Sequence, residues 1–412
     1  MNKVALLSIK WIRLSLCLIT LSFFVLSCEK DEIESVENQK TLFMYLPWST
    51  NLTSNFYTNI SDMEKAISQK GLNGERVIVF MSTTSEKAIL FEITCKKGKC
   101  EQVTLKEYNN PPFTTAEGIT SILNDVKSFA PAPTYAMTIG CHGMGWLPVH
   151  STKGRARTSI RMHWENEGVP QTRYFGGTTS QYQTDITTLA EGITDAGIKM
   201  EYILFDDCYM STIEVAYDLR NVTDYLIGST CEIMAYGMPY SIIGKDLMGE
   251  PNYQAICDGF YSFYSTYEEM PCGTLGITNC AELDHLATIM KEINNRYTFD
   301  PSKRNQLQPL DGYYPVIFYD YGDYVAHLCD DTSLLKEFKE QLERTVPYKT
   351  HTESYYSMNT GTTTPIKTFS GITVSDPSNA LNRLYTRLDN PETIFTLIIK
   401  YLQEVNFLST RT

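Results

Sequence analysis

The sequence lacks an excess of basic charge, and it lacks the residue spacing of a metal site. Its 412 residues carry 35 Lys and Arg against 48 Asp and Glu, which gives a formal net charge of −13. A chain of this acidity repels nucleic acid, so nucleic acid is not an expected partner. The eleven cysteines form no Cys-x-x-Cys pair and no Cys/His ligand spacing, which argues against a zinc site. No internal repeat or low-complexity tract is present either.

The first 27 residues have the pattern of a secretory signal instead of a folded segment. Three basic residues precede an apolar stretch over residues 14–26, and this order is typical of a signal peptide. The stretch is shorter than the apolar segment that a membrane-spanning helix needs. It closes on Val25-Leu26-Ser27-Cys28, which resembles a bacterial lipobox and implies cleavage before Cys28 and lipidation of its thiol. An ordinary signal peptide or a short anchor helix is the alternative.

The remaining chain of roughly 370 residues is long enough for a large core with a smaller appended region. We expect a signal peptide over 1–27, an acidic tether over 28–40, a core over 41–250 and a C-terminal part of the same unit over 251–412. The polar tether cannot bury a core. An acidic stretch after a lipidated cysteine also resembles the surface-export signal of some Gram-negative lipoproteins. We therefore expect a lipid anchor in the bacterial outer membrane, at the cell surface, although the lipobox does not decide the face.

The cysteines suggest one local disulfide. Cys95 and Cys100 flank residues 96–99, which have the composition of a hairpin tip. After Cys17 leaves with the signal and Cys28 becomes the anchor, nine of the eleven cysteines remain, so at least one thiol stays unpaired. Apart from Cys208, the others are expected to be buried as small hydrophobes: Cys141, Cys231, Cys257, Cys272, Cys280 and Cys329.

Apolar strand and helix patterns alternate along the chain. This order predicts an α/β fold with a largely parallel sheet and helices on both faces. Residues 146–180 break the pattern and predict a long exposed excursion. The expected strands are 41–45, 76–81, 88–94, 101–105, 135–139, 202–205, 225–229, 274–278 and 371–374. The expected helices are 56–70, 115–129, 186–198, 211–219, 253–267, 282–297, 332–345 and 393–404.

Two of the expected strands end at reactive side chains. The strand 135–139 leads to His142, and the strand 202–205 leads to Cys208. The carboxyl ends of parallel strands meet at one edge of a sheet, where an imidazole and a thiol form a base and a nucleophile. We expect a helix to begin just after Cys208 and to stabilise its thiolate with free amides. No third residue is required, because a thiol is already partly ionised near neutral pH.

The backbone N–H groups of Gly143 and Cys208 are the expected donors to the oxyanion. Gly143 has no side chain, so a substrate backbone can approach it closely. A lone cysteine at the end of an apolar strand is more often part of the core than catalytic, and a single His-Gly pair arises readily by chance. The occurrence of both at predicted strand ends in neighbouring units favours catalysis.

Several segments together resemble the clostripain family of cysteine peptidases. Residues 138–146 (Thr-Ile-Gly-Cys-His-Gly-Met-Gly-Trp) resemble its His-Gly-x-Gly-Trp segment. Residues 206–219 (Asp-Asp-Cys-Tyr-Met-Ser-Thr-Ile-Glu-Val-Ala-Tyr-Asp-Leu) resemble its Asp-Ala-Cys-Leu-Met block, which continues to Glu-Val-Ala-Tyr-Glu-Leu. Residues 224–229, 237–240 and 319–325 extend the resemblance.

The resemblance implies a caspase-like or gingipain-like open sheet, mostly parallel and flanked by helices, with a C-terminal α/β extension. It implies an endopeptidase acting on proteins or peptides, with His142 as base and Cys208 as nucleophile. It implies no certain cofactor, although some members depend on calcium. Many members are cut between the His and Cys strands, and they cleave after Arg or Lys.

The chain departs from the family pattern in its expected substrate pocket. Counted from Cys208, Tyr236 stands where basic-specific members carry an Asp. A phenol cannot serve as counter-ion to a guanidinium, so the departure argues against specificity for Arg or Lys. Glu232 is an alternative source of charge or an ordinary loop acid, and Met234 and Met238 favour an apolar pocket. We assign Asp206, which precedes the nucleophile by two positions, to the same pocket.

A second departure is Asp207, which replaces a small residue beside Cys208. In an extended segment its carboxylate points to the opposite face from Cys208. A carboxylate that did approach the thiol would raise the pKa of that thiol and blunt its reactivity.

The excursion after residue 146 contains candidate processing sites, which are Lys153, Arg155, Arg157 and Arg161. Such a stretch fits a self-cleaving enzyme with basic specificity, and it also fits an ordinary solvated loop. If Tyr236 abolishes basic specificity, self-cleavage here should fail, although a trypsin-like host enzyme could still cut. Two other functions stay open, namely a catalytically silent binding lipoprotein at the cell surface and a transpeptidase.

Overall fold

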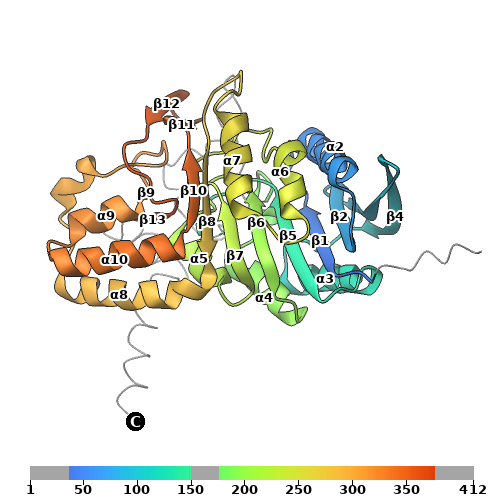
Figure 1. Ribbon diagram of the computed structural model, residues 1–412, viewed down its shortest axis with the longest axis horizontal. Coiled ribbons are helices and arrows are strands. Elements are labelled where there is room, and N and C mark those ends of the chain that lie inside the picture. The colour runs from blue at the N-terminus through green and yellow to red at the C-terminus, as the bar shows by residue number, and fades with distance from the viewer. Residues whose placement is uncertain (1–36, 148, 150–175, 376–412) are drawn as a thin grey trace, which may run out of the picture. The chain divides into compact units, whose positions relative to one another are not determined.

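A nine-stranded sheet forms the centre of the computed structural model, which describes residues 37–147, 149 and 176–375 (Figure 1). The strands lie in the order β10-β8-β7-β6-β5-β1-β2-β3-β4. The five middle strands, from β7 to β2, pair in parallel, and the strands outside them pair antiparallel. Their bounds are β1 Lys40–Leu46, β2 Glu75–Thr84, β3 Lys87–Lys96, β4 Lys99–Asn109, β5 Thr134–Gly140, β6 Met200–Asp206, β7 Thr223–Gly228, β8 Thr274–Asn279 and β10 Tyr348–His351.

The order of the strands reverses at β1. The chain first moves outward from β1 through β2, β3 and β4, and it then returns to the other side of β1 to form β5. The loops that follow β1 and β5 therefore leave the sheet in opposite directions. In open α/β sheets, the crevice at the carboxyl ends of two such strands is the usual place for a binding site.

Helices cover both faces of the sheet. The helices α2, α6 and α7 pack against one another, and α3, α4 and α5 form a second group. The crossovers β1-α2-β2 and β5-α4-β6 step along the sheet in opposite directions, so right-handed connections place α2 and α4 on opposite faces. The bounds are α2 Thr53–Lys70, α3 Ala116–Phe129, α4 Ile186–Asp195, α5 Ile213–Leu219, α6 Tyr240–Leu247, α7 Tyr253–Tyr264, α8 Leu283–Arg296, α9 Tyr321–Leu328 and α10 Thr332–Thr345.

The second half of the chain adds β8 and β10 to the same sheet. Two small antiparallel pairs lie outside it, β9 (Phe318–Asp320) with β13 (Thr373–Ser375) and β11 (Ser354–Ser357) with β12 (Thr362–Pro365). Short 3-10 helices span Ser180–Tyr182, Cys280–Glu282 and Pro301–Gln306. By their contacts, the described residues from Asn38 onward belong to one unit.

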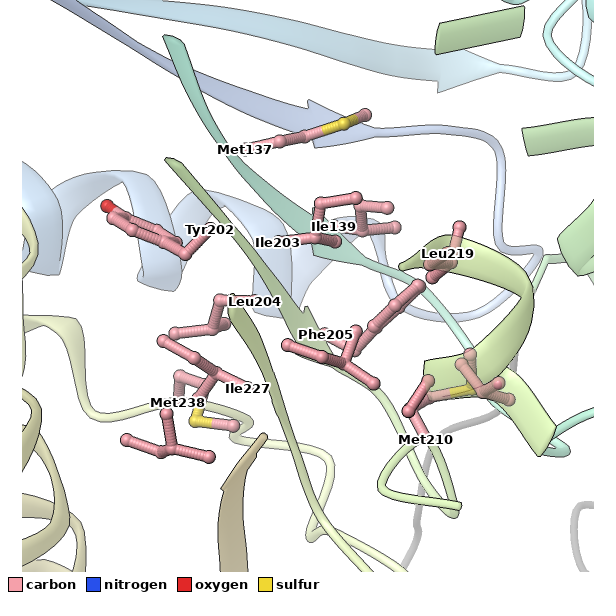
Figure 2. Close-up of a cluster of buried hydrophobic side chains, with 14 of the residues drawn as sticks. Met137, Ile139, Tyr202, Ile203, Leu204, Phe205, Met210, Leu219, Ile227 and Met238 are labelled. Atoms are coloured by element: carbon pink, nitrogen blue, oxygen red, sulfur yellow. The ribbon is translucent and has the colours of Figure 1, made fainter. Parts of the chain in front are cut away.

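The strands β5 and β6 run through the middle of the hydrophobic core. Because both faces of a parallel sheet are covered by helices, their residues read as nearly continuous apolar runs. Figure 2 shows side chains from these strands meeting others from the following segments. The labelled residues are Met137, Ile139, Tyr202, Ile203, Leu204, Phe205, Met210, Leu219, Ile227 and Met238, and all are buried.

The expected α/β fold is confirmed, and each expected element within the described residues overlaps an observed one, although several ends differ by two or three residues. The helix over 332–345 has the bounds that the apolar spacing predicts, and α3 begins after Thr115, whose side chain accepts a hydrogen bond from Gly118 N. The disulfide between Cys95 and Cys100 joins β3 to β4, and the other cysteines expected to be core residues are buried. The helices α6 and α9 and the strands β9, β10, β11 and β12 were not predicted. The expected helix over 393–404 and the expected signal lie outside the described residues.

Among the described residues, no helix combines the length and the apolar character needed to cross a membrane.

Candidate active site

Two parallel neighbours in the sheet, β5 and β6, carry the expected imidazole and thiol. Gly140, the last residue of β5, pairs with Asp206, the last residue of β6. His142 and Cys208 each follow two positions later. The register of the sheet therefore brings the two loops to the same level of its carboxyl edge.

The two loops touch at Gly143. A side chain placed at Gly143 would put its Cβ only 2.2 Å from the Cys208 backbone oxygen and 2.9 Å from the Cys208 nitrogen. Such a contact is sterically forbidden, so only glycine fits here. The two residues expected to supply the oxyanion donors thus lie directly against each other.

The acidic residues before Cys208 are buried and bind different loops. Asp206 Oδ1 accepts a hydrogen bond from Met238 N at 2.6 Å. Asp207 Oδ1 accepts one from Cys141 N, also at 2.6 Å, and so joins the end of β6 to the end of β5. The two adjacent carboxylates therefore diverge, as an extended segment requires. Asp207, the unusual residue of the motif, is anchored to the backbone of the histidine loop.

The Cys208 thiol is buried and lies against Ile233. Ile233 N donates to Cys208 Sγ at 3.3 Å, and the thiol lies 3.7 Å from the Ile233 carbonyl oxygen. His142 is buried as well. The backbone of Ile233 thus offers the sulfur both a donor and an acceptor.

The expected helix terminus at the thiol is wrong. The helix α5 begins at Ile213, because its N-cap is Thr212, whose hydroxyl accepts from Val215 N at 3.1 Å. Cys208 instead sits in a turn in which Tyr209 adopts a left-handed φ of +59°. The signal that was missed is the Ser-Thr pair ahead of the apolar helix, which marks an N-cap.

The histidine has a partner that sequence reasoning missed. The His142 Nε2 atom lies 2.7 Å from Asn51 Oδ1, and its backbone N donates to Gly176 O at 3.4 Å. Asn51 belongs to the loop between β1 and α2, which follows the strand at which the strand order reverses. An available signal was the polar run Ser49-Thr50-Asn51, which begins three positions after a buried strand that ends at the same edge.

Glu232 is held in the core by three partners. Its carboxylate accepts hydrogen bonds from the hydroxyls of Tyr209 at 2.7 Å and Ser357 at 2.8 Å. Met358 N donates to both carboxylate oxygens, at 3.1 and 3.2 Å. These contacts join the cysteine turn to the β11 segment, which begins more than 120 positions later.

Tyr236 is half-buried and points toward α2 and α7. Its hydroxyl donates to Asp62, a buried residue of α2. Its ring stacks on Phe263 with 4.7 Å between centroids, and Tyr267 lies 6.3 Å away. Burial, followed by the hydrogen bond to Asp62, raises the pKa of Tyr236 above its ordinary value.

A loop from the second half of the chain crosses the two candidate loops. The Tyr313 hydroxyl lies 3.1 Å from Met144 Sδ in the histidine loop, and Tyr209 stacks on Phe318 with 5.1 Å between centroids. Asp311 folds this loop by accepting from the backbone N–H groups of Tyr313, Ile317 and Phe318. Burial raises the pKa of Asp311 to about 7, although these hydrogen bonds oppose the shift.

Other expected site residues lie outside the described part of the chain. They are the lipidation residue Cys28 and the processing candidates Lys153, Arg155, Arg157 and Arg161. Within residues 37–147, 149 and 176–375, no three His, Cys, Asp or Glu side chains come together as a metal site would require.

Known cysteine peptidases resemble this chain in sequence and in fold. The sequence model of the clostripain family matches residues 44–396. A secreted C11 cysteine protease from Bacteroides thetaiotaomicron, iotapain, is 63% identical, with a TM-score of 0.77 over 83% of this chain and 95% of that chain. No curated protein matches the chain.

Two further solved structures extend the similarity. A clostripain from B. thetaiotaomicron in complex with the peptide inhibitor BTN-VLTK-AOMK is 66% identical, with a TM-score of 0.50 over 52% of this chain and 96% of that chain. An inactive zymogen C11 protease from Parabacteroides distasonis is 27% identical, with a TM-score of 0.70 over 85% of this chain and 96% of that chain.

Proposed function

The chain belongs to the clostripain family of cysteine peptidases, and on that premise we propose that Cys208 and His142 form its catalytic dyad. The observation that supports this assignment is the contact of Gly143 with the backbone of Cys208, at the matched ends of β5 and β6. The sheet thus presents a thiol, an imidazole and two backbone N–H groups within one short stretch of its carboxyl edge.

In this proposal the Cys208 thiol loses its proton to His142 as sulfur attacks the scissile carbonyl. The N–H groups of Gly143 and Cys208 stabilise the negative oxygen of the tetrahedral intermediate. The imidazolium then gives its proton to the leaving amine, and a thioester remains on Cys208. Water hydrolyses the thioester with His142 again acting as base. Capture of the thioester by an amine would instead make a transpeptidase, and analysis of the products would separate the two.

The dyad is tested with the chain without its signal, residues 29–412, beside Cys208→Ala and His142→Ala. Turnover of a fluorogenic peptide by the parent alone supports the dyad. Turnover by either folded variant at the parent's rate would overturn it. Silence from a folded and processed parent would favour the catalytically silent binding lipoprotein.

We further propose a basic residue before the cut, with Asp206 as its counter-ion. The peptide part of the inhibitor bound to the 66% identical relative ends in lysine, and Asp206 is a buried carboxylate two positions before Cys208. Glu232 is held by Tyr209, Ser357 and Met358, so it is a poorer candidate for this role. The apolar pocket expected from Tyr236 is the competing hypothesis. A peptide library that varies the residue before the cut decides between them, since hydrolysis confined to aromatic or aliphatic residues would reject a basic pocket.

The chain is also proposed to be made as a zymogen. His142 and Cys208 are both buried, so a substrate cannot reach the thiol without some rearrangement, and one relative is described as an inactive zymogen. We propose cleavage near Lys153, Arg155, Arg157 or Arg161. Mass spectrometry of the parent and of Cys208→Ala after incubation, with and without calcium, tests self-cleavage. Cleavage of both proteins alike would show that another protease does the cutting.

Export is supported by relatives that are described as secreted. We propose in addition that Cys28 carries a lipid anchor in the outer membrane and that the enzyme acts at the cell surface. In cells, Cys28→Ser should move the protein from the detergent phase to the aqueous phase of a Triton X-114 partition. An unchanged distribution would reject the anchor, and protease shaving of whole cells would test the surface location.

A further inference from the structure

We propose that Asn51 is a positioning residue for His142, fixing the tautomer and the orientation of its imidazole. The inference rests on the proposed role of His142 as the catalytic base. It changes the expectation that a thiol and an imidazole need no third group. The observation behind it is the 2.7 Å contact between Asn51 Oδ1 and His142 Nε2.

The topology of the sheet explains why these two residues meet. Asn51 follows β1 and His142 follows β5, and these strands are parallel neighbours on either side of the reversal in strand order. Loops that diverge at such a point leave a crevice between them. A side chain from each loop meets the other at this point, although the residues are 91 positions apart.

The chemistry of the pair sets the tautomer. The carbonyl oxygen of an asparagine side chain only accepts hydrogen bonds, so Nε2 of His142 must carry the hydrogen that it donates. In a neutral imidazole the other nitrogen, Nδ1, is then the basic atom. Asn51 thus selects Nδ1 as the atom that takes the proton from the thiol. A neutral amide does this without the large rise in imidazole pKa that a carboxylate would cause.

The loop that carries Asn51 is held in an unusual conformation. Thr50 adopts a left-handed φ of 60°, which is rare for a residue branched at Cβ. Its hydroxyl accepts a hydrogen bond from Thr178 N at 3.1 Å, and Asn51 N donates to Ser49 O at 2.6 Å. Such strain persists only where the surroundings enforce it, and it clusters at functional sites.

The segment that braces Thr50 also holds the histidine. Gly176 O accepts from His142 N at 3.4 Å, and Thr178 binds Thr50 two positions later. One short segment thus fixes both ends of the Asn51–His142 contact. This arrangement fixes the backbone of His142 and the loop that carries Asn51, while the ring itself is oriented by the Asn51 contact.

The test compares Asn51→Ala and Asn51→Asp in the processed enzyme of residues 29–412. The control variant is Asn55→Ala, at a residue four positions later, in the first turn of α2. Asn51 lies at the surface, so its replacement should leave the melting temperature nearly unchanged. Loss of the acceptor should lower kcat about 10- to 100-fold and leave KM unchanged. Asn51→Asp keeps an acceptor, so it should recover most of kcat. Its carboxylate should also raise the pKa of the imidazolium and shift the acidic limb of the pH–kcat profile upward.

A second readout does not depend on activity. In the Cys208→Ala protein, the ¹⁵N NMR shifts of His142 should report the tautomer protonated at Nε2, and addition of Asn51→Ala should give a mixture. The proposal is overturned if Asn51→Ala turns over like the parent, or if the tautomer is unaffected. These results would leave the dyad standing, whereas an active His142→Ala variant would remove the dyad itself.

Discussion

The loops that follow β5 and β6 differ from the loop that follows β7, although all three leave the same edge of the sheet. The first two contact each other over a short distance, through Gly143 and through Asp207 with Cys141. The third loop also contacts the cysteine loop, through Ile233 and Met238. Its two acidic and aromatic candidates differ, because Glu232 and Tyr236 are in addition bound to distant parts of the chain. The difference shows that one edge can combine a reactive region built by neighbouring strands with a supporting region built by remote contacts.

The largest expected effect separates two buried thiols, one in each region. Cys208 and Cys231 are both buried and neither forms a disulfide, and burial raises the pKa of the Cys231 thiol well above its ordinary value. Cys208→Ala should lower kcat at least about a thousandfold, because it removes the nucleophile. Cys231→Ala should keep kcat within a few-fold of the parent. Steady-state kinetics on the two folded variants measures both kcat values. Equal losses of kcat would contradict the assignment of Cys208, and not Cys231, as the nucleophile.

The next effect separates the two adjacent carboxylates. If Asp206 holds a basic side chain, Asp206→Asn should cost about 2–5 kcal/mol in kcat/KM for peptides with lysine before the cut. Asp207→Ala should instead lower the free energy of unfolding by about 1–3 kcal/mol, because Cys141 N loses its acceptor. Peptide kinetics measures the loss of kcat/KM expected for Asp206→Asn, and urea unfolding measures the loss of stability expected for Asp207→Ala. A pure stability loss in Asp206→Asn would reject its role in the pocket.

Glu232, in the loop that follows β7, is expected to support the fold without contacting the substrate. Glu232→Ala would leave the hydroxyls of Tyr209 and Ser357 and the Met358 N–H without this acceptor. We expect a loss of about 2–4 kcal/mol in the free energy of unfolding, with a smaller loss for Glu232→Gln, which keeps one acceptor oxygen. The preference for the residue before the cut should not change in Glu232→Gln. A selective loss of lysine cleavage would show that Glu232 belongs to the pocket.

The smallest expected effect is a dependence of stability on pH that arises next to the cysteine turn. On α5, burial and then the charge of Glu214 raise the pKa of Asp218 to about 7. The folded protein therefore binds more protons at this site than the unfolded chain does between about pH 4 and pH 7. Stability should fall as pH rises through this window, and Asp218→Asn should flatten the slope. Urea unfolding at several pH values measures it, and identical slopes in both proteins would contradict the raised pKa.

The two regions also differ in how far the sequence predicts them. The strands β5 and β6 end two residues before His142 and Cys208, so strand pattern and motif together locate both residues. The contacts of Glu232 with Ser357, and of Tyr236 with Asp62, join positions 125 and 174 residues apart. No local pattern encodes such pairs, since they depend on how distant elements pack.

The same reason explains why Asn51 was missed and the helix after Cys208 was misplaced. Asn51 becomes meaningful only when β1 is known to lie beside β5. The start of α5 depends on a choice between continuing the apolar pattern back to Ser211 and capping the helix with Thr212. The helix begins at Ile213 because the Thr212 hydroxyl accepts a hydrogen bond from the Val215 N–H, which has no backbone partner in the first turn.

The most direct test of the catalytic assignment is covalent labelling of the processed enzyme with a peptide acyloxymethyl ketone that ends in lysine, followed by peptide mapping. We predict a single adduct on Cys208, formed much more slowly in His142→Ala and absent in Cys208→Ala. An adduct on another of the cysteines, or labelling of Cys208 that is indifferent to His142, would contradict the dyad at the ends of β5 and β6.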